Sequence, residues 1–85
     1  MINFSNQAWL DYVYWQKEDK TNIEKINVLI KDTMRNPFKG LGKPEPLRGK
    51  YKGYWSRRIT KEHRFVYRYR NDELYIVSCR FHYDK

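Results

Sequence analysis

The chain has one cysteine and no long apolar segment among its 85 residues. A single cysteine can form neither an internal disulfide nor a zinc cluster, which excludes a secreted disulfide scaffold and favours a reducing compartment such as the cytoplasm. No apolar run approaches the roughly 18–20 residues that span a bilayer. The first residues, MINFSNQAW, lack the charged and apolar regions of a signal peptide. We therefore expect a single domain over residues 1–85 that does not associate with a membrane.

Acidic residues are also scarce, because 10 Asp and Glu oppose 18 Lys and Arg, for a formal net charge of +8. Residues 1–42 have six basic and five acidic side chains, whereas residues 43–85 have twelve and five. Such segregation favours a polyanionic partner, and arginines interleaved with aromatic residues can bind phosphates and stack on bases. The composition thus favours a nucleic-acid ligand. The alternative is a basic surface that only keeps a small domain soluble.

Helical periodicity predicts two helices in the N-terminal half. The first is expected to follow Ser5, its N-cap, and to continue until Lys20. Thr21 and Glu24 form a Thr-x-x-Glu capping box, so a second helix is expected to begin there and to end before Pro37. Its apolar stripe consists of Ile23, Ile26, Ile30 and Met34. The short connection predicts an antiparallel helix hairpin.

The C-terminal half has the pattern of a small sheet. Residues 36–53 are rich in glycine and proline and are expected to form a loop. After Gly53 the period changes to two, which predicts three strands, YWSRRIT, HRFVYRYR and ELYIVSCRFHY, with Asn71-Asp72 as the turn between the last two. Residues 1–4 are expected to add a short edge strand.

Alternation divides each predicted strand into two faces. The face expected to lie against the helices holds mainly aromatic and aliphatic residues: Trp55, Arg57, Ile59, His63, Phe65, Tyr67, Tyr69, Tyr75, Val77, Cys79 and Phe81. The opposite face displays Arg58, Arg64, Arg68, Arg80 and His82. We therefore predict an α+β fold, in which an N-terminal helix hairpin packs on one face of a small, mainly antiparallel sheet and a cationic surface forms the other face.

One acid and one histidine stand out beside these arginines. Glu45 lies between Pro44 and Pro46 in a basic stretch, and His82 shares the cationic face; each could also be an ordinary solvated side chain. His63 and Cys79 fall on the aromatic face and are interpreted as structural. Because RNA carries its own nucleophile, the 2′-OH, a carboxylate, an imidazolium and arginines suffice for its cleavage without a metal or cofactor.

Three stretches resemble a known family: WLDYVYWQKEDK, KINVLIKDTMRNPFKGLGKPEPLRGKYKGYWSRRITKEHRFVY and CRFHY. They are similar to the YoeB/Txe toxins of bacterial toxin–antitoxin modules, a branch of the RelE superfamily. The resemblance implies a fold like that of the microbial ribonucleases and a cytoplasmic endonuclease that cuts mRNA in the A site of the 70S ribosome. It also implies neutralisation by a YefM-type antitoxin, and it leaves a homodimer open.

The resemblance also assigns roles to six residues. They are the general base Glu45 of GKPEPL, the phosphate-binding Arg64 of EHR, the assisting Arg58 of WSRR, the general acid His82, the adjacent Tyr83, and the basic Arg48 after PEPL. Asp84 and Lys85 extend the chain beyond the terminal HY pair of the family. The stretch RYRND adds Arg68 and Arg70 as further candidates for contact with ribosomal RNA.

A non-catalytic RNA-binding module is the alternative function, since arginines and aromatic residues on a sheet would serve it equally well. Glu45 discriminates between the two functions, because a carboxylate in a surface that only binds phosphate would weaken the affinity.

Overall fold

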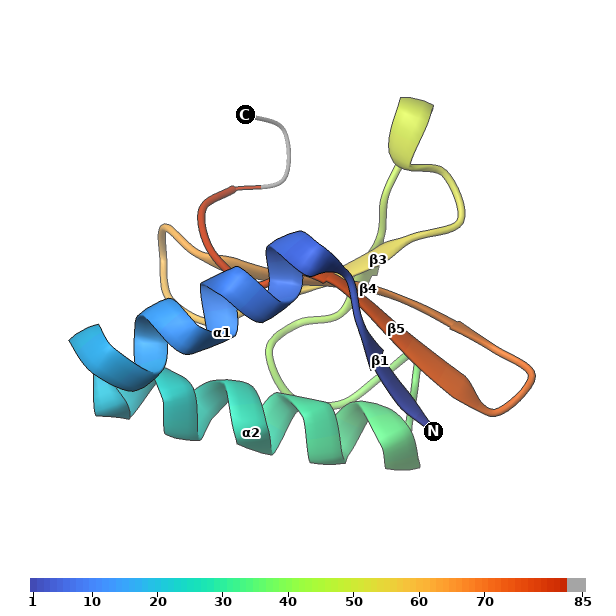
Figure 1. Cartoon of the computed structure of the whole chain (residues 1–85). Coiled ribbons are helices and arrows are strands. Elements are labelled where there is room, and N and C mark those ends of the chain that lie inside the picture. Colours follow the sequence, from blue (N-terminus) through green and yellow to red (C-terminus); the bar gives the residue numbers. More distant parts are fainter. Residues whose placement is uncertain (83–85) are drawn as a thin grey trace.

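The computed structural model describes residues 1–82, in which two helices lie on one face of a five-stranded sheet (Figure 1). The elements are β1 (Ile2–Phe4), α1 (Asn6–Glu18), α2 (Lys20–Arg35), β2 (Glu45–Pro46), the short 3₁₀ helix η1 (Gly49–Tyr51), β3 (Trp55–Arg58), β4 (Arg64–Arg70) and β5 (Glu73–Ser78). The strand order is β1-β5-β4-β3-β2. Among the strands of residues 1–82, β1 alone pairs in parallel, with β5. The predicted α+β fold and the edge strand are confirmed. Among the described residues, no helix combines the length and the apolar character needed to cross a membrane.

Asp19 separates the two helices. The Ser5 side chain caps α1 as predicted, by accepting the Ala8 N–H at 3.0 Å. The capping box is wrong, because α2 begins at Lys20 and its N-cap is Asp19, whose Oδ1 accepts the N–H groups of Thr21 and Asn22. A carboxylate that bonds two free amides at the positive end of a helix is a strong cap. The second helix therefore starts earlier than Thr21.

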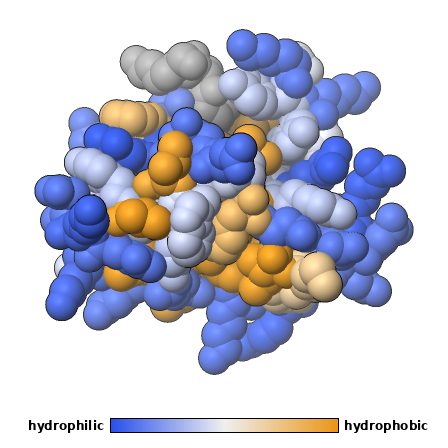
Figure 2. Space-filling model, in the orientation of Figure 1, coloured by the Kyte–Doolittle hydropathy of each residue, from blue (hydrophilic) through white to orange (hydrophobic). Residues whose placement is uncertain are grey.

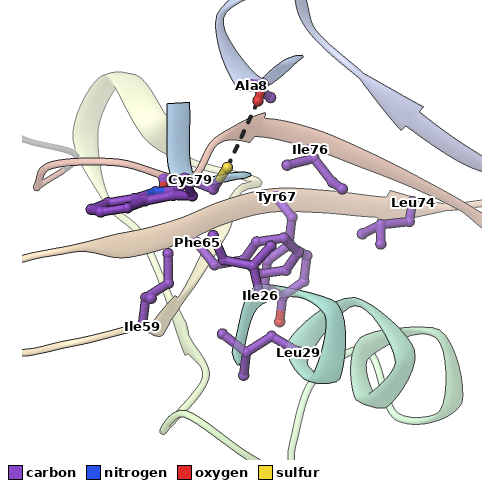
Figure 3. Packing of buried hydrophobic residues seen from close by; sticks show 10 residues of the cluster. Ala8, Ile26, Leu29, Ile59, Phe65, Tyr67, Leu74, Ile76 and Cys79 are labelled. Carbon is purple, nitrogen blue, oxygen red and sulfur yellow. Dashed lines mark hydrogen bonds between the residues drawn. The ribbon is translucent and has the colours of Figure 1, made fainter. Parts of the chain in front are cut away.

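The core lies between the helices and the sheet (Figure 3). Ile26 and Leu29 of α2 point toward Phe65 and Tyr67 of β4, and all four side chains are buried. Ile26 belongs to the predicted stripe, whereas Leu29 does not. The other stripe members, Ile23, Ile30 and Met34, are half-buried and pack around the cluster. Burial of the predicted face of α2 thus holds the hairpin on the sheet.

The predicted faces are wrong for the first part of β5. Arg68 pairs with Tyr75, but Val66 pairs with Ser78, so β5 contains one residue more than β4 over this stretch. This bulge shifts the alternation by one residue. Leu74 and Ile76 therefore face the core, and Tyr75 lies beside Arg68 on the opposite face. After the bulge Cys79 is buried as expected, whereas Phe81, which was predicted to share its face, is exposed.

The predicted loop of residues 36–53 contains the two-residue strand β2. Glu45 pairs with Ser56 and Pro46 pairs with Trp55. Proline is tolerated here because β2 is an edge strand, whose outer side has no partner strand to accept an N–H. Glu45 is therefore anchored by backbone pairing to β3 rather than by a rigid loop alone.

Candidate active site

Glu45 lies at the end of a row of residues on the sheet face opposite the helices. Successive cross-strand partners form the row: Glu45 on β2, Ser56 on β3, Val66 on β4 and Ser78 on β5. Ser56 and Val66 are each 1% exposed, whereas Glu45 is exposed. The three inner residues of this row are thus uncharged, and the carboxylate of Glu45 lies at the exposed edge of the sheet.

Two arginines lie next to this row. Arg58 pairs directly with Arg64 across β3 and β4, so both side chains share the face of Glu45. Arg58 is the diagonal neighbour of Glu45, at a typical Cα separation of about 7–8 Å. Like charges directly opposite each other in a sheet are unfavourable. The pair is therefore suited to bind an anion that lies beside Glu45.

The loop before β4 holds one end of the Arg64 guanidinium. Arg64 Nη1 donates to the carbonyl oxygens of Thr60 at 2.9 Å, Lys61 at 3.1 Å and His63 at 3.2 Å. Within residues 1–82, no hydrogen bond engages Nε or Nη2 of this side chain. Two parallel N–H donors in this arrangement match two oxygens of a phosphate. Arg64 is therefore oriented before any ligand binds.

His82 lies on the far side of Arg64 from Arg58. The Arg64 N–H donates to the Phe81 carbonyl at 3.1 Å, so the segment after β5 continues to pair with the start of β4. His82 is the next residue, and it lines a cleft of about 730 Å³ together with Tyr14, Trp15, Glu62, His63, Arg80 and Phe81. Across the sheet the order is thus Glu45, Arg58, Arg64 and His82. In strand order, β2 with Glu45 and the segment with His82 thus lie on opposite sides of the strands that carry the arginine pair.

A family model described as "YoeB-like toxin of bacterial type II toxin-antitoxin system" matches residues 4–83. The chain belongs to this family. Toxin YoeB of Escherichia coli strain K12 is 58% identical to it over 80 residues, which cover 94% of this chain and 95% of that relative. These matches confirm the resemblance that the sequence motifs indicated.

Solved structures of YoeB-type toxins have the same fold. The YoeB/ParE toxin from Agrobacterium tumefaciens superposes with a TM-score of 0.94 at 54% identity, over 96% of this chain and 98% of the other. The YoeB chain of a YoeB–YefM complex from Staphylococcus aureus gives a TM-score of 0.91 at 46% identity, over 98% and 97% of the two chains. The arrangement of helices and sheet in Figure 1 is therefore that of the YoeB toxins.

The other residues that the family resemblance singled out are not brought into this arrangement by any described contact. Arg48 is exposed at the start of η1, on the side of Glu45 away from Arg58. Tyr83 lies outside the described residues, as do Asp84 and Lys85. Their predicted roles stay predictions.

Arg80 does not share the open face of the sheet as predicted. Its guanidinium stacks on Tyr14 of α1, 3.4 Å from the ring centroid, and also lies over Phe81. The strict alternation fails because β5 ends at Ser78 and Phe81 has a φ of 64°. Arg80 thus forms a wall of the cleft near His82.

A second cationic row flanks Glu45 on its other side. Arg68 pairs with Tyr75, and its guanidinium carbon lies 5.1 Å from the ring centroid of Tyr75 and 5.6 Å from that of Tyr54. The buried Arg68 Nε has no hydrogen-bond partner among the described residues. The row that begins at Glu45 therefore lies between two rows that contain arginine.

The sequence pattern did not predict the role of Arg57. Its side chain is fully buried, and it donates to Asp32 Oδ2 at 2.6 Å and to the carbonyl oxygens of Asn36, Lys39 and Leu41. These bonds fix the loop that leads from α2 to Glu45. Alternation did place Arg57 on the core face, and a buried guanidinium requires an acidic partner. The sequence thus contained one indication that Arg57 forms a buried ion pair.

The same cluster determines the ionisation of Asp32. The Leu41 N–H donates to Asp32 Oδ2 at 2.9 Å, and Arg57 adds a charged hydrogen bond. These contacts hold the pKa of the Asp32 carboxyl below its ordinary value. The close approach also disfavours a side chain at residue 40, because a Cβ on Gly40 would overlap Asp32 Oδ2.

No group of three or more His, Cys, Asp or Glu residues that could hold a metal ion occurs in the part of the chain that the structure describes.

Proposed function

We propose that this YoeB-family toxin is an endoribonuclease that cleaves mRNA in the ribosomal A site and thereby stops translation. The observation that carries the proposal is the cross-strand pair Arg58–Arg64, with Glu45 on the strand at one side and the segment that carries His82 at the other. A phosphodiester bound by the two guanidinium groups would have a carboxylate near one ester oxygen and an imidazole near the other.

In the proposed reaction the 2′-OH of the substrate is the nucleophile. Glu45 removes its proton, and O2′ attacks the adjacent phosphorus. Arg64, assisted by Arg58, stabilises the additional negative charge of the pentacovalent state. His82 gives a proton to the departing 5′-oxygen. The products are a 2′,3′-cyclic phosphate and a free 5′-OH, and no step requires a metal ion.

The ribosome orients the RNA strand, which the small site does not do by itself. Two arginines and the net charge of +8 attract RNA of any sequence, but they do not orient a flexible strand for in-line attack. We propose that the A site holds the mRNA across the Glu45 row. Arg48, Arg68 and Arg70 would then contact RNA outside the cleavage site.

A YefM-type antitoxin is the proposed inhibitor of this chain. The S. aureus YoeB relative has been solved in complex with YefM, and the cationic face here has the charge to attract an acidic segment. Coverage of Arg58 and Arg64 would remove phosphate binding and catalysis together. A homodimer stays a prediction, which sedimentation of the purified chain would test.

The alternative is an RNA-binding module without catalytic activity. The position of Glu45 favours the enzyme. Its negative charge next to Arg58 weakens phosphate binding, so a surface that only binds RNA has no use for it, whereas proton transfer requires such a group.

The chemistry of the fragment ends tests the proposal. Ribosomes programmed with a defined mRNA are incubated with the toxin, and the ends of both fragments are analysed. We expect a 2′,3′-cyclic phosphate, or the phosphate formed when it opens, upstream and a 5′-OH downstream. A single 2′-deoxy nucleotide at the cut site should abolish cleavage, whereas one placed two nucleotides away should not. A 5′-phosphate on the downstream fragment would show that water attacks and would overturn the mechanism.

A further inference from the structure

His63 forms a specific hydrogen bond with the segment that carries His82. The Phe81 N–H donates to His63 Nδ1 at 2.8 Å. An amide nitrogen can only donate, so Nδ1 must be unprotonated in this arrangement. The proton of a neutral His63 is therefore on Nε2. His63 thus presents an acceptor to the segment after β5.

The ring of His63 is held firmly in place. It packs edge-on against Trp15, with 4.8 Å between the ring centroids. Its backbone N–H donates to Thr60 Oγ1 at 3.1 Å, and its carbonyl accepts the Ile59 N–H at 3.0 Å. An acceptor fixed on a well-packed turn can determine the position of a flexible partner.

Phe81 needs such support because its backbone is in the left-handed region, with a φ of 64°. That conformation is an outlier for a bulky residue and is unfavourable unless surrounding contacts hold it. Its N–H bonds to His63, and its carbonyl accepts the N–H of Arg64. His63 and Arg64, at the start of β4, therefore bind both polar backbone groups of Phe81. The next residue in the chain is His82.

We propose that His63 is a positioning residue for His82. Its Nδ1 holds the Phe81 peptide in register with β4, and this contact fixes the backbone position from which His82 extends at the start of β4. The inference rests on the proposed function, because it assigns His63 the task of placing the general acid. His63 itself neither touches the substrate nor transfers a proton.

A purely structural role for His63 would rest on its contact with Trp15. The two contacts have different chemical requirements, so substitution can separate them. Packing on Trp15 needs a flat ring, whereas the Phe81 amide needs an acceptor at the position of Nδ1. His63→Phe keeps a ring and removes the acceptor. His63→Asn removes the ring and keeps an acceptor, because Asn Oδ1 is the same number of bonds from Cβ as Nδ1.

The first experiment measures cleavage on programmed ribosomes by the full-length variants. We expect His63→Phe to lower kcat about 10- to 100-fold, the range associated with a misplaced catalytic group, with an apparent KM within about twofold of wild type. His63→Asn should retain kcat within about threefold, even where its Tm falls further. Equal losses of kcat in the two variants, or a fall that follows Tm, would show a packing role and overturn the proposal.

The second experiment does not depend on activity. Amide hydrogen exchange by NMR should show Phe81 protected in wild type and His63→Asn but exposed in His63→Phe, with the ring signals of His82 shifted. The Val66 amide in the middle of β4 serves as the folding control and should stay protected in all three proteins. If wild type cleaves no RNA, the proposed function fails and the exchange result alone decides the inference. Protection of Phe81 in His63→Phe would overturn it.

Discussion

Arg57 donates to Asp32 Oδ2 at 2.6 Å in the interior of the protein, between β3 and α2. The Arg57 side chain is fully buried, and Asp32 is largely so. The same guanidinium bonds to loop carbonyls that precede Glu45. The structural ion pair and the candidate general base therefore lie at the two ends of one loop.

The first prediction concerns the pH dependence of stability. The pKa of Asp32 is lowered in the folded protein, so its contribution to stability is present above the unfolded pKa of about 3.9 and disappears as the pH falls through the folded value. Asp32→Asn should lower the free energy of unfolding at pH 7, and the difference from wild type should narrow below about pH 4. Urea unfolding between pH 3 and pH 7 measures this, with Asp72→Asn in the exposed β4–β5 turn as control. A difference that is constant with pH would contradict the prediction.

The second prediction separates catalysis from binding at Glu45. Glu45→Gln should reduce the single-turnover cleavage rate about 10²- to 10⁴-fold, the usual loss for a general base. Affinity for the programmed ribosome should stay the same or increase, because a negative charge next to Arg58 is removed. Glu24→Gln, on the exposed surface of α2, makes the same chemical change away from the site. If both variants cleave at the wild-type rate, Glu45 is not the base.

The third prediction compares two arginines on the same strand. Arg64→Gln should lower kcat and weaken binding, because in the proposed reaction its guanidinium contacts the reacting phosphate. Arg68→Gln should mainly raise the apparent KM, because Arg68 lies in the row on the other side of Glu45. Kinetics on programmed ribosomes at two salt concentrations measure both values. Equal loss of kcat in the two variants would mean that the two rows are not functionally distinct.

The fourth prediction concerns the thiol of Cys79. The side chain is fully buried, and its Sγ–H points to the Ala8 carbonyl at 3.7 Å (Figure 3). Burial, together with the charge of Asp11, raises the pKa of Cys79 to about 12. The native protein should therefore react with a disulfide reagent at pH 8 far more slowly than the protein unfolded in urea. Rapid reaction under native conditions would show that this part of the core opens readily.

The composition predicted part of the distribution of charge on the surface. In the view of Figure 2 the hydrophilic colour dominates, and the hydrophobic residues form smaller areas between the hydrophilic ones. The excess of basic residues after residue 42 predicted a cationic face of the sheet. The structure agrees for Arg58 and Arg64, which pair across β3 and β4. It disagrees for Arg80, which packs on Tyr14.

Local patterns by themselves determined the two helices, the strands β3 to β5 and the class of fold. Ser5 at a helix start, the apolar period of α2 and the alternation of β4 depend on neighbours within a few residues. The motifs around Glu45, Arg64 and His82 likewise indicated the toxin family. The matches to YoeB toxins confirm that family.

The tertiary structure decided the features that depend on distant partners. The bulge in β5 exists because Leu74 and Ile76 are buried against the helices while Ser78 keeps its pairing with Val66. Any of ten acidic residues could have paired with Arg57, and only the packing of α2 under β3 selects Asp32. The left-handed Phe81 is stable because His63 and Arg64 bind its peptide groups. Burial and hydrogen bonding between remote segments outweigh local preference at these positions, which is why they were not predictable from the sequence.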